Sequence, residues 1–204
     1  MYDKRYFERY ALLSVCHMFN YDIERFMKCC EKPDLQSEEY DIGIEVTQSI
    51  TEHDGTTIML INSYFGRGLS GNEILESIHQ ANKKNKFKGS CTIVDDVAII
   101  SPTKGLYDSS KHRELIIRSI IEKSEKFSGY KHFRINGLYC FAHTGLIDES
   151  DYPCILDACR NSAFSLVLIN CIDRILHWNA LYDSFLSYDI SYDLLTKWKK
   201  EALQ

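Results

Sequence analysis

Long apolar segments are absent from this sequence of 204 residues. A membrane-spanning helix needs roughly 20 consecutive apolar residues, whereas the longest apolar stretch, residues 165–172, ends before Asp173. A secretory signal is also missing, because the first ten residues, MYDKRYFERY, are charged and aromatic where such a signal is apolar. These absences predict a cytoplasmic protein with no membrane partner.

Metal-binding and disulfide spacings are absent among the eight cysteines and seven histidines. No C-x-x-C pair and no H-x-x-x-H or H-E-x-x-H spacing occurs, so neither a structural zinc nor a zinc hydrolase is supported. The cysteines are scattered, mostly in apolar surroundings, where free cysteine behaves as a small hydrophobe. We therefore expect buried thiols in a reducing compartment rather than a disulfide framework.

A P-loop and an excess of positive charge are also lacking. No G-x-x-x-x-G-K-[ST] sequence occurs, which excludes P-loop nucleotide hydrolases. The glycine-rich turn at residues 65–73 precedes a helix whose start could hold an anion, although such a turn is more often a plain loop. The net charge of −5 argues against a protein that coats nucleic acid through bulk electrostatics.

What the sequence does contain is an alternation of helical and strand-like segments. Helices are predicted at residues 6–19, 73–83, 111–130, 152–163 and 192–203, and strands at 41–47, 91–100, 137–143 and 165–170. Residues 172–178 extend or pair with the last strand, and residues 56–65 fit either type. This order predicts an α/β fold in which helices flank a mixed central sheet. We expect a single domain over residues 1–204, with residues 184–204 as a C-terminal helical extension.

Two carboxylates stand eleven residues apart in the first quarter of the chain, Asp34 after a proline and Glu45 within a strand. The strand predicted at 41–47 alternates three apolar residues on one face with Glu45 on the other. Hard cations such as Mg²⁺ take oxygen ligands, commonly one or two carboxylates with waters and substrate phosphates. The pair is therefore the basic equipment of a phosphodiester-cleaving site.

Two charged residues fall on apolar helix stripes. At about 100° per residue, Glu8 faces the buried side of the first predicted helix, and Lys123 lies within roughly 60° of the apolar residues of the long helix. Glu8 could form a salt bridge at the helix start, reach solvent, or face a cation. Lys123 could extend to water, or meet the two acids and stabilise charge on a phosphate.

A helix with Glu8, then Pro33-Asp34, then a strand ending in Glu45-Val46-Thr47 resembles the PD-(D/E)XK nuclease superfamily. The resemblance covers residues 1–50 by motif and 110–180 by the order of elements, and it implies a restriction-endonuclease-like core. It implies that Asp34, Glu45 and Glu8, with the backbone carbonyl of Val46, bind Mg²⁺ or Mn²⁺. It also implies that a lysine positions or activates the attacking water.

The sequence departs from the family pattern at Thr47, where the motif has lysine. Some members of the superfamily carry a migrated lysine on a neighbouring helix. The resemblance gives that role to Lys123, with Lys126 as the substitute and Tyr130 as a supporting residue. Thr47 and Gln48 could also support the metal or a substrate phosphate. If neither lysine reaches the acids, the chain keeps the fold without catalysis.

Three hypotheses follow. The first is a Mg²⁺-dependent endonuclease that hydrolyses DNA, with RNA as the alternative substrate and a homodimer for double-strand cleavage. The second is a catalytically degenerate protein of this fold that binds or inhibits a protein partner in phage defence or counter-defence. The acidic balance and tyrosines such as Tyr182, Tyr188 and Tyr192 fit such a partner. The third is an unrelated α/β protein in which Asp34 and Glu45 are ordinary turn and strand residues.

Overall fold

The computed structural model of this chain describes residues 4–26, 30–51, 55, 70–83, 89–94, 97–102 and 108–204. The chain divides into two compact units. The larger unit comprises Tyr2–Ser49 and Ser109–Gln204, and the smaller one comprises Ile50–Asp108 together with Met1. The smaller unit is therefore an insertion, in sequence, between the two segments of the larger unit.

The larger unit is built on a six-stranded sheet with the order β1-β2-β5-β6-β7-β8. The strands are β1 (Leu35–Ser37), β2 (Ile42–Gln48), β5 (Ile135–Phe141), β6 (Leu166–Asn170), β7 (Arg174–Asn179) and β8 (Phe185–Asp189). β2, β5 and β6 run parallel, whereas β1, β7 and β8 pair antiparallel with their neighbours. The predicted mixed α/β architecture is confirmed.

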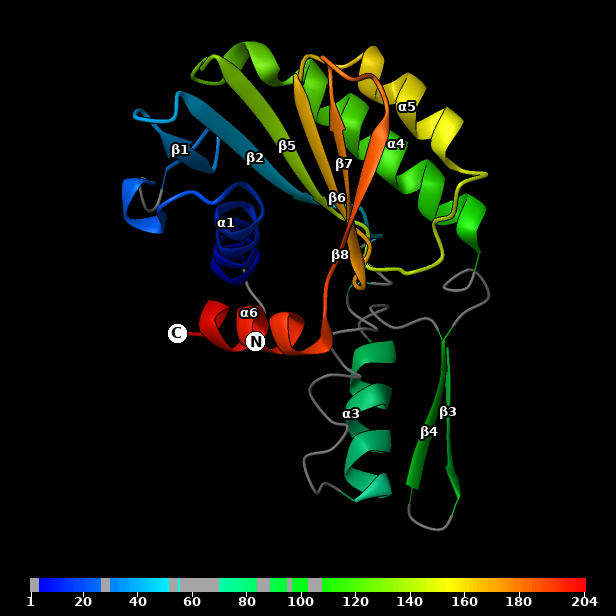
Figure 1. Cartoon of the computed structure of the whole chain (residues 1–204). Helices are drawn as coiled ribbons and strands as arrows, with labels where there is room; N and C mark the ends of the chain where they lie inside the picture. Colours follow the sequence, from blue (N-terminus) through cyan, green and yellow to red (C-terminus); the bar gives the residue numbers. More distant parts are fainter. Residues whose placement is uncertain are drawn as a thin grey trace. The chain divides into compact units, whose positions relative to one another are not determined.

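Helices cover both faces of this sheet (Figure 1). α1 (Lys4–Phe19) and α6 (Tyr192–Ala202) pack with one core cluster, and α4 (Ser109–Glu125) and α5 (Tyr152–Arg160) pack with the other. Ile44 of β2 belongs to the first cluster and Leu138 of β5 to the second, and both are fully buried. A slip of one residue along β2 would move Ile44 to the opposite face, so these cores also determine which way Glu45 points.

The smaller unit contains α3 (Gly71–Lys83) and an antiparallel hairpin of β3 (Gly89–Val94) and β4 (Val97–Pro102). Ser70 and Glu73 form a reciprocal capping box at the start of α3, which confirms the predicted helix. The strand predicted at residues 91–100 extends further in the structure, because Ser101 and Pro102 both pair with β3. Gly66, Gly68 and Gly71 have the G-x-G-x-x-G spacing of dinucleotide-binding loops, but residues 56–69 lie outside the described residues.

Several predicted boundaries are wrong. The long helix ends at Glu125, not at Tyr130, and a 3₁₀ turn, η2 (Phe127–Gly129), leads into extended backbone at Tyr130. A glycine inside a helix is unfavourable by about 1 kcal/mol, which disfavours continuation through Gly129. β1 and β8 were not predicted at all. Residues 184–204 therefore contain a strand of the sheet as well as the expected helix.

The expectation of free thiols is confirmed for the cysteines that the structure describes. Four of the free thiols are buried: Cys16, Cys140, Cys159 and Cys171. Cys154 is exposed. None of the helices in the described residues is both long and apolar enough to cross a membrane.

Candidate functional site

The hairpin of β1 and β2 brings Asp34 next to Glu45. Leu35 pairs with Ile44 in the antiparallel register. Asp34 directly precedes Leu35 and Glu45 directly follows Ile44, so the two acids lie at the same end of this strand pair. The backbone N–H of Val46 donates to Oδ2 of Asp34 at 2.9 Å. Both carboxylates are buried, with 5% exposure for Asp34 and 6% for Glu45.

Lys123 reaches this acid pair from α4. Glu45 pairs with Leu138 in the parallel register of β2 and β5, and Leu138 belongs to the core cluster beneath α4. Glu45 therefore points to the α4 side, where Nζ of Lys123 donates to its Oε1 at 2.6 Å. The Lys123 side chain is only 24% exposed. Its ammonium therefore does not simply extend to water, because it is paired with Glu45.

Thr47 lies on the same face of β2 as Glu45, since its register partner is Cys140 of the α4-side core. Two residues further on, the Ser49 hydroxyl donates a hydrogen bond to Oγ of Ser119 at 2.9 Å, and Ser119 lies one helical turn before Lys123. The polar face of β2 therefore runs along α4. Lys123 therefore comes from the helix that runs along the polar face of β2, which includes Thr47.

Glu8 and Lys4 of α1 lie beside Asp34, and together with Glu45 and Lys123 these residues form the acidic cluster. Nζ of Lys4 lies 3.1 Å from Oε1 of Glu8 and 3.0 Å from Oδ1 of Asp34. Burial is the main cause that raises the pKa of Glu8, and the nearby charge of Asp34 adds to it. The hydrogen bond to Asp34 is the main cause that raises the pKa of Lys4. Lys4 was missed from the sequence, although its spacing of four residues before an inward glutamate was a usable signal.

Tyr130 is buried against the same acids. Burial raises its pKa most, and the negative charges of Glu45 and Asp34 raise it further. The phenol is therefore protonated near neutral pH and can donate a proton in a hydrogen bond but cannot serve as a base.

Two expected supporting residues do not join the cluster. Lys126 is exposed at the cap position of η2 and forms no side-chain cap hydrogen bond. Gln48 lies on the other face of β2 from Glu45, and its Oε1 lies 3.1 Å from Nε2 of His143. Lys126 shows no ion pair with either acid among the described residues.

The site can supply two carboxylates, Asp34 and Glu45, to a hard cation, and the remaining ligands would have to be waters or substrate phosphates. Among the described residues, no group of three or more His, Cys, Asp or Glu side chains is arranged to hold a metal. Oε2 of Glu45 is nevertheless buried and has no hydrogen-bond partner in the described part of the chain. Mg²⁺ commonly takes only one or two carboxylates, with waters and substrate phosphates as the other ligands. Asp34 and Glu45 meet that lower requirement.

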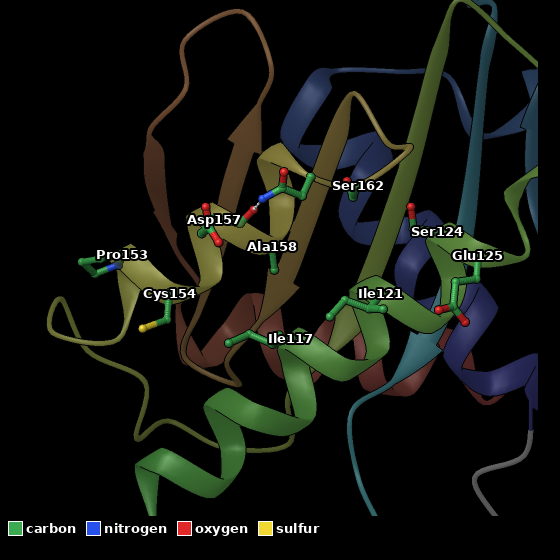
Figure 2. A pocket seen from close by; sticks show the side chains of 10 residues that line it. Ile117, Ile121, Ser124, Glu125, Pro153, Cys154, Asp157, Ala158 and Ser162 are labelled. Carbon is green, nitrogen blue, oxygen red and sulfur yellow. Dashed lines mark hydrogen bonds between the residues drawn. The ribbon is translucent and has the colours of Figure 1, made fainter.

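A separate hollow of about 630 Å³ lies between α4 and α5. Figure 2 shows Ile117 and Ile121 on one side of it and Pro153, Cys154 and Ala158 on the other. None of the residues that line this hollow belongs to the acidic cluster.

Comparison with known proteins adds no identification, because no family model, no curated protein and no solved structure matches this chain. Any functional assignment therefore depends on the arrangement of the residues described above.

Proposed function

We propose that this chain is a metal-dependent nuclease of the PD-(D/E)XK type that hydrolyses DNA phosphodiester bonds in the cytoplasm. One observation carries the proposal. The sequence has Thr47 where the motif has lysine, and Lys123 contacts Glu45 from α4 through a 2.6 Å ion pair. An acid pair can hold a cation that assists phosphodiester hydrolysis, and an adjacent ammonium can stabilise the charge that develops on the phosphate.

The acids would hold the cation. Asp34 and Glu45 are the proposed ligands for Mg²⁺ or Mn²⁺, with Glu8 and the backbone carbonyl of Val46 as further oxygen donors. When bound, such an ion polarises a phosphate oxygen and lowers the pKa of a water. The Val46 N–H fixes one oxygen of Asp34, so the other, Oδ1, is the oxygen available on the side of Glu8 and Lys4.

Lys123 has two tasks in this proposal. Its bond to Oε1 holds the Glu45 carboxylate in place while Oε2 stays free of hydrogen bonds from the described residues. An ammonium has three donors, and one of them is used by Glu45. The others can hold the attacking water or a phosphate oxygen on which negative charge develops in the transition state.

The second candidate is a catalytically degenerate protein of this fold that acts on a protein partner. One observation favours it: the Lys4 ammonium already neutralises Asp34, as expected of acids that no longer bind metal. The two candidates differ in whether Mg²⁺ or Mn²⁺ binds at Asp34.

Cleavage assays test the first candidate. Purified protein is incubated with supercoiled plasmid, single-stranded DNA or RNA, in Mg²⁺, in Mn²⁺ or in EDTA. We expect cation-dependent cleavage of DNA, and a loss of at least about 100-fold in Asp34→Asn, Glu45→Gln and Lys123→Met, because each change removes a group that acts on the transition state. Lys126→Met is the matched control, since it removes an exposed lysine of the same segment, and it should retain activity.

Two results would overturn the proposal. Cleavage that persists in Asp34→Asn and Glu45→Gln would mean that the activity resides elsewhere. Absence of cleavage of all three substrates, at a Mn²⁺ concentration that saturates the protein in calorimetry, would remove the nuclease assignment. Absence of any Mn²⁺ heat that depends on Asp34 would favour the second candidate.

A further inference from the structure

The Lys4 side chain occupies the position of a cation between two acids. Its Nζ lies 3.0 Å from Oδ1 of Asp34 and 3.1 Å from Oε1 of Glu8. Asp34 has little access to water, with a side chain that is 5% exposed, whereas the Lys4 side chain is 67% exposed. A buried carboxylate is thus neutralised by a lysine whose stem lies in solvent.

A second feature of the cluster shows that Lys4 does not satisfy it. The side chain of Glu45 is only 8% exposed, and its Oε2 has no hydrogen-bond partner among the described residues. Burial of an unpaired carboxylate oxygen is unfavourable. An additional cation at the acids would remove that penalty. Within the described residues, the ion pairs of Lys4 are with Asp34 and Glu8 and not with Glu45.

The Lys4 ammonium can move away from the acids into water, because its side chain is 67% exposed and a lysine that leaves its partners is solvated at once. The lysine ammonium is a point charge on a four-carbon stem that can swing away without disturbing α1. A divalent cation carries twice the charge and sits closer, at about 2.0–2.1 Å from oxygen for Mg²⁺. The ion and the ammonium would repel each other at such a distance and cannot share Oδ1 of Asp34.

We propose that Lys4 is an internal counter-ion of the cation site, which a divalent cation must displace from Asp34 and Glu8 before the site is loaded. This inference rests on the proposed function for the identity of the site, but it concerns a residue outside the family motif. Lys4 then sets the concentration of divalent cation at which the acids are occupied. It also keeps the acids neutralised, and the α1 start attached to the Pro33-Asp34 turn, when that concentration is low.

Calorimetric titration with Mn²⁺ alone, without nucleic acid, tests the inference. We expect Lys4→Met to bind Mn²⁺ at least tenfold more tightly than the wild type, because no ammonium competes for Oδ1. Arg5→Met removes the same charge from the adjacent residue of α1, which is exposed, and should change the affinity less than twofold. Lys4→Arg keeps the charge and should remain close to the wild type. The gain in Lys4→Met should vanish when Asp34→Asn is added.

A second readout does not depend on affinity. In EDTA, Lys4→Met should melt at a lower temperature than Arg5→Met, because Asp34 and Glu8 lose their shared cation, and saturating Mn²⁺ should raise its melting temperature more than that of the wild type. The inference is overturned if Lys4→Met and Arg5→Met shift the Mn²⁺ affinity equally, if Lys4→Met binds more weakly, or if neither it nor the wild type binds Mn²⁺. DNA cleavage with an unchanged Mn²⁺ affinity in Lys4→Met would refute this inference alone. Tighter Mn²⁺ binding without any cleavage would refute the proposed nuclease alone.

Discussion

Nζ of Lys123 lies 2.6 Å from Oε1 of Glu45 and joins two residues that are 78 positions apart in the chain. The contact fastens α4 to β2 at the point where the acidic cluster begins. The Glu45 carboxylate is therefore neutralised by a lysine that follows the inserted unit, Ile50–Asp108, in the sequence.

The first prediction concerns this ion pair. Lys123→Met leaves the Glu45 carboxylate buried without a cation, so we expect a loss of about 1–3 kcal/mol in the free energy of unfolding, less than for a fully buried pair because Lys123 is partly exposed. Glu45→Gln removes the charge and should restore much of the loss in the double variant. Urea unfolding at neutral pH measures the cycle.

Arg118→Met is the matched control for that cycle, because its partner Glu122 is 56% exposed and the pair is a surface one. It should change the unfolding free energy by less than about 0.5 kcal/mol. Strictly additive losses in the Lys123→Met, Glu45→Gln double variant would contradict coupling between the two residues.

The second prediction concerns the hydrogen bond that orients Asp34. Asp34→Asn keeps an oxygen that can accept from the Val46 N–H, whereas Asp34→Ala leaves that buried donor unpaired. Asp34→Ala should therefore be less stable than Asp34→Asn by about 1–2 kcal/mol in urea unfolding. The same two changes at Asp173, whose side chain is 61% exposed, should differ by much less. Equal stability of Asp34→Ala and Asp34→Asn would rule out an orienting role for the Val46 N–H.

The sequence predicted those residues of the acidic cluster that stand out within the pattern of a single helix or strand, and it did not predict Lys4. Glu8 and Lys123 were found because each is a charged residue on the apolar stripe of a helix. Glu45 was found because it alternates with the apolar residues of a strand. Each of these signals is visible within a single element. Lys4 gave only an i, i+4 spacing to Glu8, and its contact with Asp34 depends on a fold that no local pattern contains.

The missed strands have a similar explanation. β1 has only three residues, too few for an alternation to be recognised. β8 lies at the edge of the sheet, and three of its five residues are exposed, so its sequence shows no apolar face. The division into two units was not visible either, because the segment that follows β2 has an ordinary composition and begins without a proline-rich or glycine-rich linker.

The third prediction concerns Gly43, which lies between the Pro33-Asp34 turn and Phe133. A Cβ at this position would come within 2.7 Å of Cγ of Pro33 and even closer to Cδ2 of Phe133. Gly43→Ala should therefore destabilise the protein by about 1–3 kcal/mol through overpacking. It should also weaken Mn²⁺ binding, because the displaced Pro33 carries Asp34 with it.

Gly129→Ala is the control for Gly43→Ala, because no atom lies within 4 Å of a Cβ added there. Melting temperature and Mn²⁺ calorimetry on both variants make the comparison. If the Phe133 ring is what clashes with the added Cβ, the double variant Gly43→Ala, Phe133→Leu should recover part of the lost stability. A Gly43→Ala protein as stable as Gly129→Ala would disprove the close packing of this turn.

The last prediction concerns acid stability and His143, at the end of β5. Its ring packs edge-on against Phe7 and tilted against Phe141, and burial, with a smaller contribution from His112, lowers the pKa of His143 to about 4 from 6.5. Between these two values the unfolded chain binds more protons than the folded one, so the stability that neutral His143 contributes is complete above pH 6.5 and is lost as the pH falls towards 4.

We expect this loss to be of the order of 1–3 kcal/mol. Urea unfolding from pH 7.5 to pH 4.5 measures it, and His143→Gln should show a shallower decline than the wild type, because glutamine cannot take up the proton. Only the slopes are compared, since His143 has a φ of 54° and any replacement changes the absolute stability. His132→Gln, at an exposed position, should keep the wild-type slope. A His143→Gln slope equal to that of the wild type would show that other groups cause the acid sensitivity.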